Sequence, residues 1–226
     1  MKTGQPLRGP KKKVLIVDDH PLLREGLGRI VNQQDDLVVC GEAGDAPQGL
    51  AALAKCRPDV VIVDISLEEG SGLDLIKALH AREPQLPILA LSMHHEDLYA
   101  DRALRAGARG YVMKREPAGS VLAALRKVLG GRMAVSENVA GRLLRRRVRG
   151  APSPARSPAE LLSDRELEVF RCLGEGLGTR AIAGRLRLAV STVESHRAGI
   201  KQKLDLKTAT ELVSRAAQFV ATEPGN

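Results

Sequence analysis

The first half of the chain carries five side chains suited to holding a cation and a phosphoryl group. Each follows a short run of apolar residues: Asp18, Asp19, Asp64, Ser92 and Lys114. Carboxylates brought together repel one another, and a hard divalent cation such as Mg²⁺ relieves that repulsion. An Asp carboxylate beside such a cation can attack a phosphoryl donor and form an acyl phosphate. Ser92 can donate a hydrogen bond to a phosphoryl oxygen, and Lys114 can pair with its charge.

These groups come together only if the apolar runs form one parallel sheet. The runs predict strands at Lys13–Val17, Leu37–Cys40, Asp59–Val63, Pro87–Leu91 and Gly110–Met113. Helical periodicity predicts helices at Pro21–Val31, Pro47–Cys56, Leu73–Ala81, Asp97–Ala106 and Ala118–Leu129. Continuous apolar strands that alternate with helices are typical of a doubly wound α/β fold with a five-stranded parallel sheet. Such a sheet carries its chemistry at the carboxyl ends of its strands, where these polar residues lie.

Each of these residues has a simpler explanation when taken alone. A single Asp after a strand, such as Asp18, commonly caps a helix or forms a turn. The arrival of all five groups at the ends of four different strands favours one shared site. His20, His94 and His95 also suggest metal binding, but each stands where a helix is expected to begin, and we assign them no role.

Residues 11–131 closely resemble the receiver domain of two-component response regulators. The matching segments are VLIVDDHP, VVIVDISLEEGSGLDL, ILALSMH and GARGYVMK. The resemblance implies a flavodoxin-like fold in which Asp64 accepts the phosphoryl group. It implies that Asp64 binds Mg²⁺ together with Asp19, Asp18 and the backbone carbonyl of Ser66. It also implies that Ser92 supplies the switch hydroxyl and that Lys114 is the phosphoryl-binding lysine. Tyr111 would be the aromatic residue that changes rotamer. The chain departs from the family at Glu68, where a proline is usual.

The second half of the chain is more basic than the first. Most of the formal net charge of +8 falls in residues 136–226, largely on arginines near the start of that range. A basic balance fits a nucleic-acid partner, because neutralised phosphates supply affinity. With no Trp, two Tyr and two Phe, the chain has few rings on which single-stranded bases could stack, so duplex DNA is favoured. We expect a receiver domain at 11–131, a basic linker containing Pro and Arg at 132–160, and an all-α DNA-binding domain at 161–220.

Helices alone are predicted in the C-terminal domain. The first begins at Ser163 or Asp164, with Glu166 completing a capping box, and the others span Thr179–Leu186, Ser191–Lys203 and Thr208–Phe219. Residues 163–217 resemble the LuxR-type helix-turn-helix domain through the segment LSDRELEVFRCLGEGLGTRAIAGRLRLAVSTVESHRAGIKQKLDLKTATEL. A receiver followed by this domain is the architecture of the NarL/FixJ response regulators.

The third of these helices is the expected DNA reader. An inward stripe leaves the other side of the helix to enter the major groove, and its expected members are Val193, His196, Ile200 and Leu204. The expected DNA contacts are Ser191, Thr192, Glu194, Ser195, Arg197, Ala198, Lys201 and Lys203. The hydroxyls at the helix start and the basic side chains suit phosphates. Family members often carry Lys at the position of Glu194. Here Glu194 either accepts from a cytosine amino group or forms an intrahelical pair with Lys201 or a neighbour of Ala198 and contacts no base.

The sequence therefore predicts a phosphorylation-controlled transcription factor. A sensor histidine kinase would phosphorylate Asp64, and the face around Ser92 and Tyr111 would repack. The C-terminal domain would then form a homodimer on double-stranded DNA through its last helix, with Leu212, Val213 and Ala216 as the expected surface. RNA polymerase is a further candidate partner. We expect a cytoplasmic protein without a membrane segment, and no enzymatic activity beyond self-phosphorylation and self-dephosphorylation at Asp64.

Two alternatives stay open. Phosphatases and phosphotransferases of the haloacid dehalogenase type usually carry a second Asp two residues after the nucleophile, where this chain has Ser66. The other alternative is a regulator that binds DNA whatever the state of Asp64. Phosphoryl labelling and DNA binding of an Asp64→Asn variant distinguish these possibilities from the main hypothesis.

Overall fold

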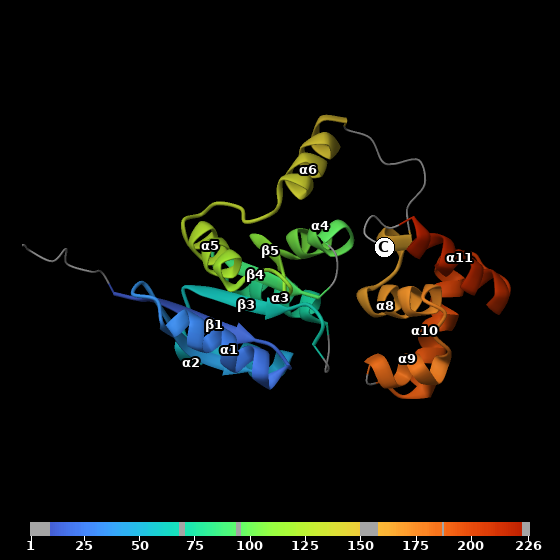
Figure 1. Cartoon of the computed structure of the whole chain (residues 1–226), viewed down its shortest axis with the longest axis horizontal. Coiled ribbons are helices and arrows are strands. Elements are labelled where there is room, and N and C mark those ends of the chain that lie inside the picture. The colour runs from blue at the N-terminus through green and yellow to red at the C-terminus, as the bar shows by residue number, and fades with distance from the viewer. Residues whose placement is uncertain (1–9, 68–70, 94–95, 150–157, 187, 223–226) are drawn as a thin grey trace, which may run out of the picture. The chain divides into compact units, whose positions relative to one another are not determined.

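The computed structural model describes residues 10–67, 71–93, 96–149, 158–186 and 188–222 (Figure 1). The chain divides into two compact units, residues 1–148 and 149–226. Each unit is a body with its own buried apolar residues. Among the described residues, no helix is long and apolar enough to cross a membrane.

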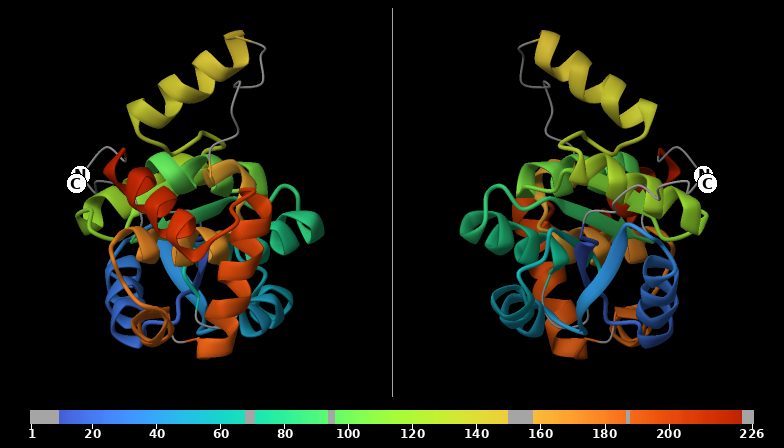
Figure 2. Two further views of the ribbon diagram at one scale, coloured as in Figure 1. Left: turned by 90° about the vertical axis from the view of Figure 1, so that its right-hand side faces the viewer. Right: turned by 90° about the vertical axis from the view of Figure 1, so that its left-hand side faces the viewer.

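A parallel sheet forms the centre of the first unit, with helices on both sides (Figures 1 and 2). Its described strands are β1 (Lys12–Val17), β2 (Leu37–Ala43), β3 (Val60–Asp64), β4 (Ile88–Ser92) and β5 (Gly110–Met113), in the order β2-β1-β3-β4-β5. The helices that cover it are α1 (Pro21–Asn32), α2 (Ala46–Cys56), α3 (Gly72–Arg82), α4 (Glu96–Ala106) and α5 (Ala118–Leu129). The predicted doubly wound α/β fold is confirmed.

The strand register explains why the polar groups converge. Val17 of β1 is paired with Val63 of β3, so the residues that follow them, Asp18 and Asp64, come to one edge of the sheet. On the other side of β3, Ser92 of β4 is paired with Met113 of β5, which Lys114 follows. The strand order reverses between β1 and β3, and doubly wound sheets bind ligands at such a switch point. The apolar strands are buried on both faces and leave their carboxyl ends to form the site.

The helix α6 (Glu137–Arg149) lies in the segment expected to be a linker, where no helix was predicted. Its start is fixed to the first unit, because the Ser136 hydroxyl donates to the Glu96 carboxylate at 2.7 Å and accepts from the backbone N–H of Val139 at 3.2 Å. Val139 is fully buried. The basic run therefore continues the receiver unit as a helix, which a count of charges and prolines does not reveal.

The described part of the second unit consists of helices: α7 (Pro158–Leu161), α8 (Asp164–Gly174), α9 (Thr179–Leu186), α10 (Val190–Lys203) and α11 (Ala209–Ala221). The predicted capping box is confirmed, since Ser163 accepts from the Glu166 N–H while the Glu166 carboxylate accepts from the Ser163 N–H. Val193 and Ile200 of α10 are buried, as the inward stripe predicted. Helices α8 and α9 present α10 on the surface of this unit.

The predicted dimer surface on α11 is wrong for two of its three residues. Leu212 and Ala216 are fully buried within the second unit, where α11 packs against α8. Val213 remains 41% exposed. An apolar stripe on a helix has the same pattern whether its own domain or a partner covers it, and here its own domain does.

Candidate metal and phosphoryl site, and candidate DNA-binding helix

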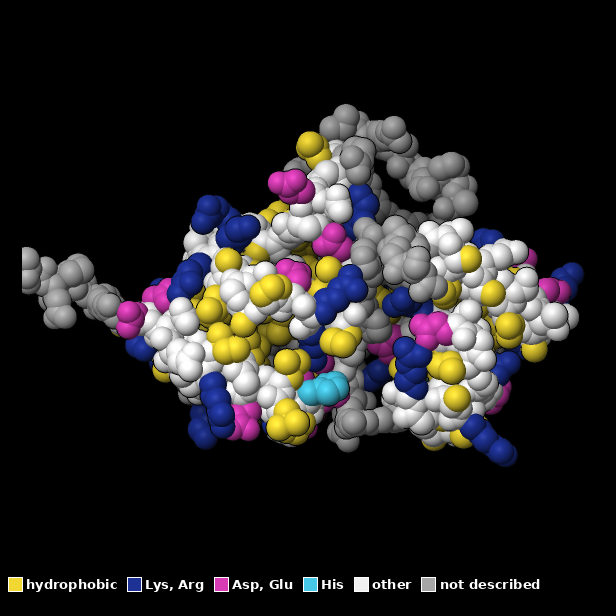
Figure 3. Space-filling view, in the orientation of Figure 1, with side chains coloured by type: hydrophobic (Ala, Val, Ile, Leu, Met, Phe, Trp, Pro, Cys, Tyr) yellow, Lys and Arg dark blue, Asp and Glu magenta, His cyan; other side chains and the backbone are white. Residues whose placement is uncertain are grey.

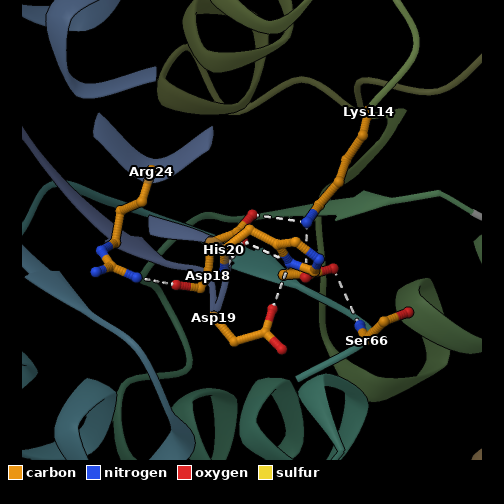
Figure 4. Close-up of polar contacts among 7 residues, drawn as sticks. Asp18, Asp19, His20, Arg24, Ser66 and Lys114 are labelled. Carbon is orange, nitrogen blue, oxygen red and sulfur yellow. Dashed lines mark hydrogen bonds and ion pairs between the residues drawn. The ribbon is translucent and has the colours of Figure 1, made fainter. Parts of the chain in front are cut away.

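Asp18, Asp64 and Lys114 form a buried ionic cluster at the carboxyl edge of the sheet (Figure 4). The ammonium nitrogen of Lys114 lies 2.8 Å from Oδ2 of Asp18 and 2.7 Å from Oδ2 of Asp64. Asp18 and Asp64 are each only 1% exposed. Burial removes the water that would screen these charges, so the groups depend on one another for compensation.

The pKa shifts of Asp64 and Lys114 show that the cluster lacks positive charge. Burial raises the pKa of Asp64, and the negative charge of Asp18 raises it further, against the attraction of Lys114. Burial works to lower the pKa of Lys114, but the two carboxylates outweigh it and the pKa of Lys114 is raised. Lys114 thus stays charged, while Asp64 is held in surroundings that disfavour its charge. Additional positive charge beside Asp64 would stabilise the ionised carboxylate.

Two more side chains complete an acidic pocket around this cluster. One oxygen or nitrogen each from Asp18, Asp19, His20 and Asp64 lie within 4.8 Å of one another. The ring Nδ1 of His20 is 2.7 Å from Oδ1 of Asp19 (Figure 4). Sequence reasoning gave His20 no role, because a His before a helix looks like an ordinary entry residue. Carboxylate oxygens are the ligands that Mg²⁺ and other hard cations prefer, so the donor set fits such an ion.

The backbone around Asp64 sets the direction of its side chain. The N–H of Ser66 donates to Oδ1 of Asp64 at 3.0 Å, which leaves Oδ2 to face Lys114. Gly72, at the start of α3, packs against the carbonyl of Asp64 so closely that a Cβ there would lie 1.9 Å from that oxygen. A residue with a side chain could not occupy this place without moving the strand end.

The two expected switch residues lie on neighbouring strands. Ser92 is fully buried at the end of β4, where its carbonyl accepts from the N–H of Lys114 at 2.8 Å. Tyr111 of β5 is 5% exposed. Glu68, the departure from the family pattern, lies outside the described residues, as do His94 and His95.

The loop that carries Asp18 is also held from α1. The guanidinium of Arg24 donates to the backbone carbonyl of Asp18 (Figure 4). It also lies 3.4 Å from the Glu42 carboxylate. The N–H of His20 donates to Oδ1 of Asp18 at 2.9 Å. Both contacts hold Asp18 through atoms other than Oδ2, the oxygen that faces Lys114. Arg24 was not predicted to take part in the site, because an Arg on an amphipathic helix has no distinguishing pattern.

The expected DNA-contacting residues of α10 fall into two groups. The first is exposed or half-buried and lies along the outer side of the helix: Ser191, Thr192, Ser195, Ala198 and Lys201. The second is engaged within the protein. Lys203 lies 2.6 Å from the Glu166 carboxylate, and Arg197 donates to the Thr179 hydroxyl.

Glu194 takes part in the same network. Its carboxylate accepts from the Thr179 hydroxyl of α9 at 2.8 Å and lies 3.6 Å from the Arg197 guanidinium. Of the partners expected within the helix, Glu194 is therefore paired with Arg197, the neighbour of Ala198, and not with Lys201. His196 is half-buried, in keeping with its place on the inward stripe.

Comparison with known families agrees with this division. Residues 14–126 match the response regulator receiver domain, and residues 160–216 match the bacterial regulatory proteins of the luxR family. Oxygen regulatory protein NreC of Staphylococcus carnosus is 36% identical over 208 residues, which cover 90% of this chain and 96% of that protein. The chain is a response regulator of the NarL/FixJ type.

Solved response regulators are similar to this chain over most or part of its length. RcsB from Salmonella enterica serovar Typhimurium, bound to promoter rprA in the presence of phosphomimetic BeF3-, is 26% identical with a TM-score of 0.58 and covers 92% of this regulator and 99% of its own chain. A LuxR-family two-component response regulator from Aurantimonas sp. SI85-9A1 is 30% identical, with a TM-score of 0.56, and covers 62% of this regulator and 99% of its own chain.

Membership of the family indicates the general function of the acidic cluster and of the C-terminal domain. Receiver domains of response regulators bind Mg²⁺ at an acidic Asp cluster, and this regulator has such a cluster in Asp18, Asp19 and Asp64. Response regulators work with histidine kinases and DNA, and they are generally transcription factors and not enzymes.

Proposed function

We propose that this response regulator is phosphorylated on Asp64 by a sensor histidine kinase and that the phosphoryl group controls dimerisation and DNA binding by its C-terminal domain. The observation that carries the proposal is the buried contact of 2.7 Å between Asp64 and Lys114 at the switch point of the sheet. A carboxylate with one positive neighbour and a raised pKa is prepared to receive more positive charge and a phosphoryl group.

Mg²⁺ is the proposed cofactor, with Asp18, Asp19, Asp64 and the backbone carbonyl of Ser66 as the protein ligands. When bound, it would neutralise negative charge on the pocket and on the phosphoryl oxygens. An oxygen of Asp64 then attacks phosphorus and the bond from phosphorus to the donor breaks, which forms the acyl phosphate. Lys114 pairs with a phosphoryl oxygen, and the hydroxyl of Ser92 donates to another.

Phosphorylation of Asp64 can alter the packing of other parts of the receiver unit through Ser92 and Tyr111. Ser92 and Tyr111 are buried on adjacent strands, and Tyr111 lines a cavity of about 240 Å³ together with Glu96 and Ser136. A Ser92 hydroxyl drawn toward the phosphoryl group leaves space that Tyr111 can enter. The packed side chains around this cavity then provide the two-state element that a switch needs.

The kinase needs a surface beside Asp64. Apolar side chains gather over α1 and α5 in Figure 3, around a cavity of about 190 Å³ lined by Leu22, Leu23, Ile30 and Val121. Leu22 is 86% exposed, and Lys114 also lines this cavity. An apolar surface next to the acceptor suits a kinase that must dock before transfer.

The DNA-binding part of the proposal rests on α10. The helix would enter the major groove of double-stranded DNA, with Ser191, Thr192, Arg197, Lys201 and Lys203 on phosphates and Glu194, Ser195 and Ala198 near base edges. RcsB, a relative, has been solved bound to promoter DNA. We place the dimer contact on the exposed side of α11, which includes Val213. RNA polymerase is a further proposed partner, and the cytoplasm is the proposed compartment because kinase and DNA are both available there.

Phosphorylation can be tested with the purified full chain and acetyl phosphate in Mg²⁺. Intact-protein mass spectrometry should show one added phosphoryl group in the wild type and none in Asp64→Asn. Asp74→Asn is the matched control, because Asp74 is exposed on α3 and paired with Lys77. Label retained by Asp64→Asn would disprove the assignment of the acceptor.

Control of DNA binding needs a second measurement on the same samples. Genome-wide footprinting identifies a binding site, and gel shifts on that site then compare phosphorylated and unphosphorylated protein. Tighter binding of the phosphorylated form is expected, and it should disappear in Asp64→Asn but persist in Asp74→Asn. Equal affinity of both forms would support the alternative in which the regulator is always on.

A further inference from the structure

His20 is the cap residue of α1, yet its side chain does not cap the helix. Its backbone is extended, Pro21 follows at the first helical position, and its ring makes no hydrogen bond to the helix N–H groups. Cap positions favour Ser, Thr, Asp and Asn because their side chains satisfy those groups. Because the His20 ring does not cap the N–H groups of α1, it can make a different contact.

That contact is made with the acidic pair. Nδ1 of His20 lies 2.7 Å from Oδ1 of Asp19 and 3.4 Å from Oδ1 of Asp18. The ring is turned back over the pocket in Figure 4, while more than half of the side chain stays exposed, at 57%. The Asp19 side chain, in contrast, is only 5% exposed. The imidazole therefore lies over a nearly buried carboxylate at the mouth of the site.

The direction of the hydrogen bond follows from its chemistry. An ionised carboxylate only accepts, so the proton in the contact with Asp19 is carried by Nδ1 of His20. This contact holds the Asp19 carboxylate by its Oδ1. Residues that donate to a ligand carboxylate in this way fix its orientation and tune the affinity of the site for its ion.

We propose that His20 is the positioning residue of the divalent-cation site, holding Asp19 through Nδ1 so that the carboxylate is already oriented for the ion. This inference rests on the Mg²⁺ site proposed above. A direct role as ligand is disfavoured for Nδ1, because a nitrogen that donates its proton to Asp19 cannot coordinate at the same time.

The chain allows a sharp choice of variants. In Asn, the side-chain amide nitrogen is attached to Cγ, as Nδ1 is in His, so His20→Asn keeps a donor in reach of Asp19. His20→Ala removes the donor. His80→Ala is the matched control, because His80 is exposed on α3, away from the acidic cluster. Thermal unfolding of each metal-free variant shows whether the fold is intact.

Isothermal titration of the unphosphorylated full chain with Mg²⁺ and with Mn²⁺ gives the readout. His20→Ala should bind both ions about tenfold more weakly, the effect usual for the loss of a residue that orients a ligand. His20→Asn should recover most of that loss, and His80→Ala should match the wild type. Metal-free stability should stay close to the wild type in all three.

Three results would overturn the inference. The first is unchanged Mg²⁺ affinity in His20→Ala. The second is a loss that His20→Asn does not repair and that is far larger for Ni²⁺ or Zn²⁺ than for Mg²⁺, because this would make the ring itself a ligand. The third is a wild type that binds no divalent ion, which also removes the proposed Mg²⁺ site. Only the third result would also contradict the proposed function. Failure of the His20 inference can therefore be distinguished from failure of the proposed function.

Discussion

The ammonium nitrogen of Lys114 lies 2.7 Å from Oδ2 of Asp64, and both side chains are almost fully buried. The same nitrogen lies 2.8 Å from Asp18. One cation thus serves two buried carboxylates, and the arrangement is short of positive charge. This imbalance is useful for binding a cation but costs stability when no cation is present, and several consequences can be measured.

Removal of Lys114 should destabilise the metal-free protein strongly. In Lys114→Met the carboxylates of Asp18 and Asp64 lose their shared partner, and breaking a buried ionic contact costs about 3 kcal/mol of unfolding free energy. Mg²⁺ should restore part of the loss by supplying charge to the same carboxylates. Urea unfolding followed by circular dichroism, with and without Mg²⁺, measures both effects. Lys77→Met, which breaks an exposed pair with Asp74, should cost less than about 1 kcal/mol.

Gly72→Ala should damage the site without touching any of its charged groups. The added Cβ would overlap the carbonyl oxygen of Asp64, at 1.9 Å, so the end of β3 or the start of α3 must move. We expect a loss of about 3 kcal/mol in unfolding free energy together with weaker Mg²⁺ binding. Gly26→Ala is the control, because nothing lies within 4 Å of its added Cβ in the interior of α1. That variant should gain about 0.5–1 kcal/mol. Similar behaviour of the two variants would contradict the close approach.

Acid should weaken the second unit through Glu166. Burial acts to raise the pKa of this carboxyl, but the contacts with Lys203 and Ser163 prevail and hold its pKa below the ordinary value. Because the folded pKa is depressed, the ionised form contributes stability above the ordinary Glu range, and this is lost as pH falls through the folded pKa. Glu166→Gln should therefore lower the urea midpoint most near neutral pH. The difference from the wild type should shrink with acid, and a constant difference from neutral to acidic pH would contradict this.

Glu194→Gln should strengthen binding to duplex DNA. The change removes a negative charge from the outer side of α10 and releases Arg197 from an acidic neighbour at 3.6 Å. One additional phosphate contact steepens the salt dependence of the affinity by about one unit of slope. Fluorescence anisotropy on the footprinted site and on unrelated DNA, at several salt concentrations, measures this. Glu175→Gln, at the end of α8, removes the same charge elsewhere on the domain and serves as the control. Weaker discrimination between the two DNAs, without a steeper slope, would instead indicate that Glu194 contacts a cytosine.

Local sequence pattern was sufficient for the architecture and for most of the site. Apolar runs such as Val60–Val63, each followed by a polar residue, determine where strands begin and end, because a strand buried on both faces needs continuous apolar side chains. Parallel pairing then brings Asp18, Asp64, Ser92 and Lys114 to one edge, whatever the details of packing. The capping box at Ser163 and Glu166 was equally local and could be predicted from two residues.

The tertiary structure decided which group touches which. Pattern shows that residues share a face, but it does not show what covers that face, so Leu212 and Ala216 looked like a dimer surface until α8 was seen to bury them. Glu194 found its partner Thr179 on another helix, and the ring of His20 turned from the helix end toward Asp19. Contacts of this kind depend on the distance between elements and on side-chain rotamers, which emerge only when the whole domain is packed.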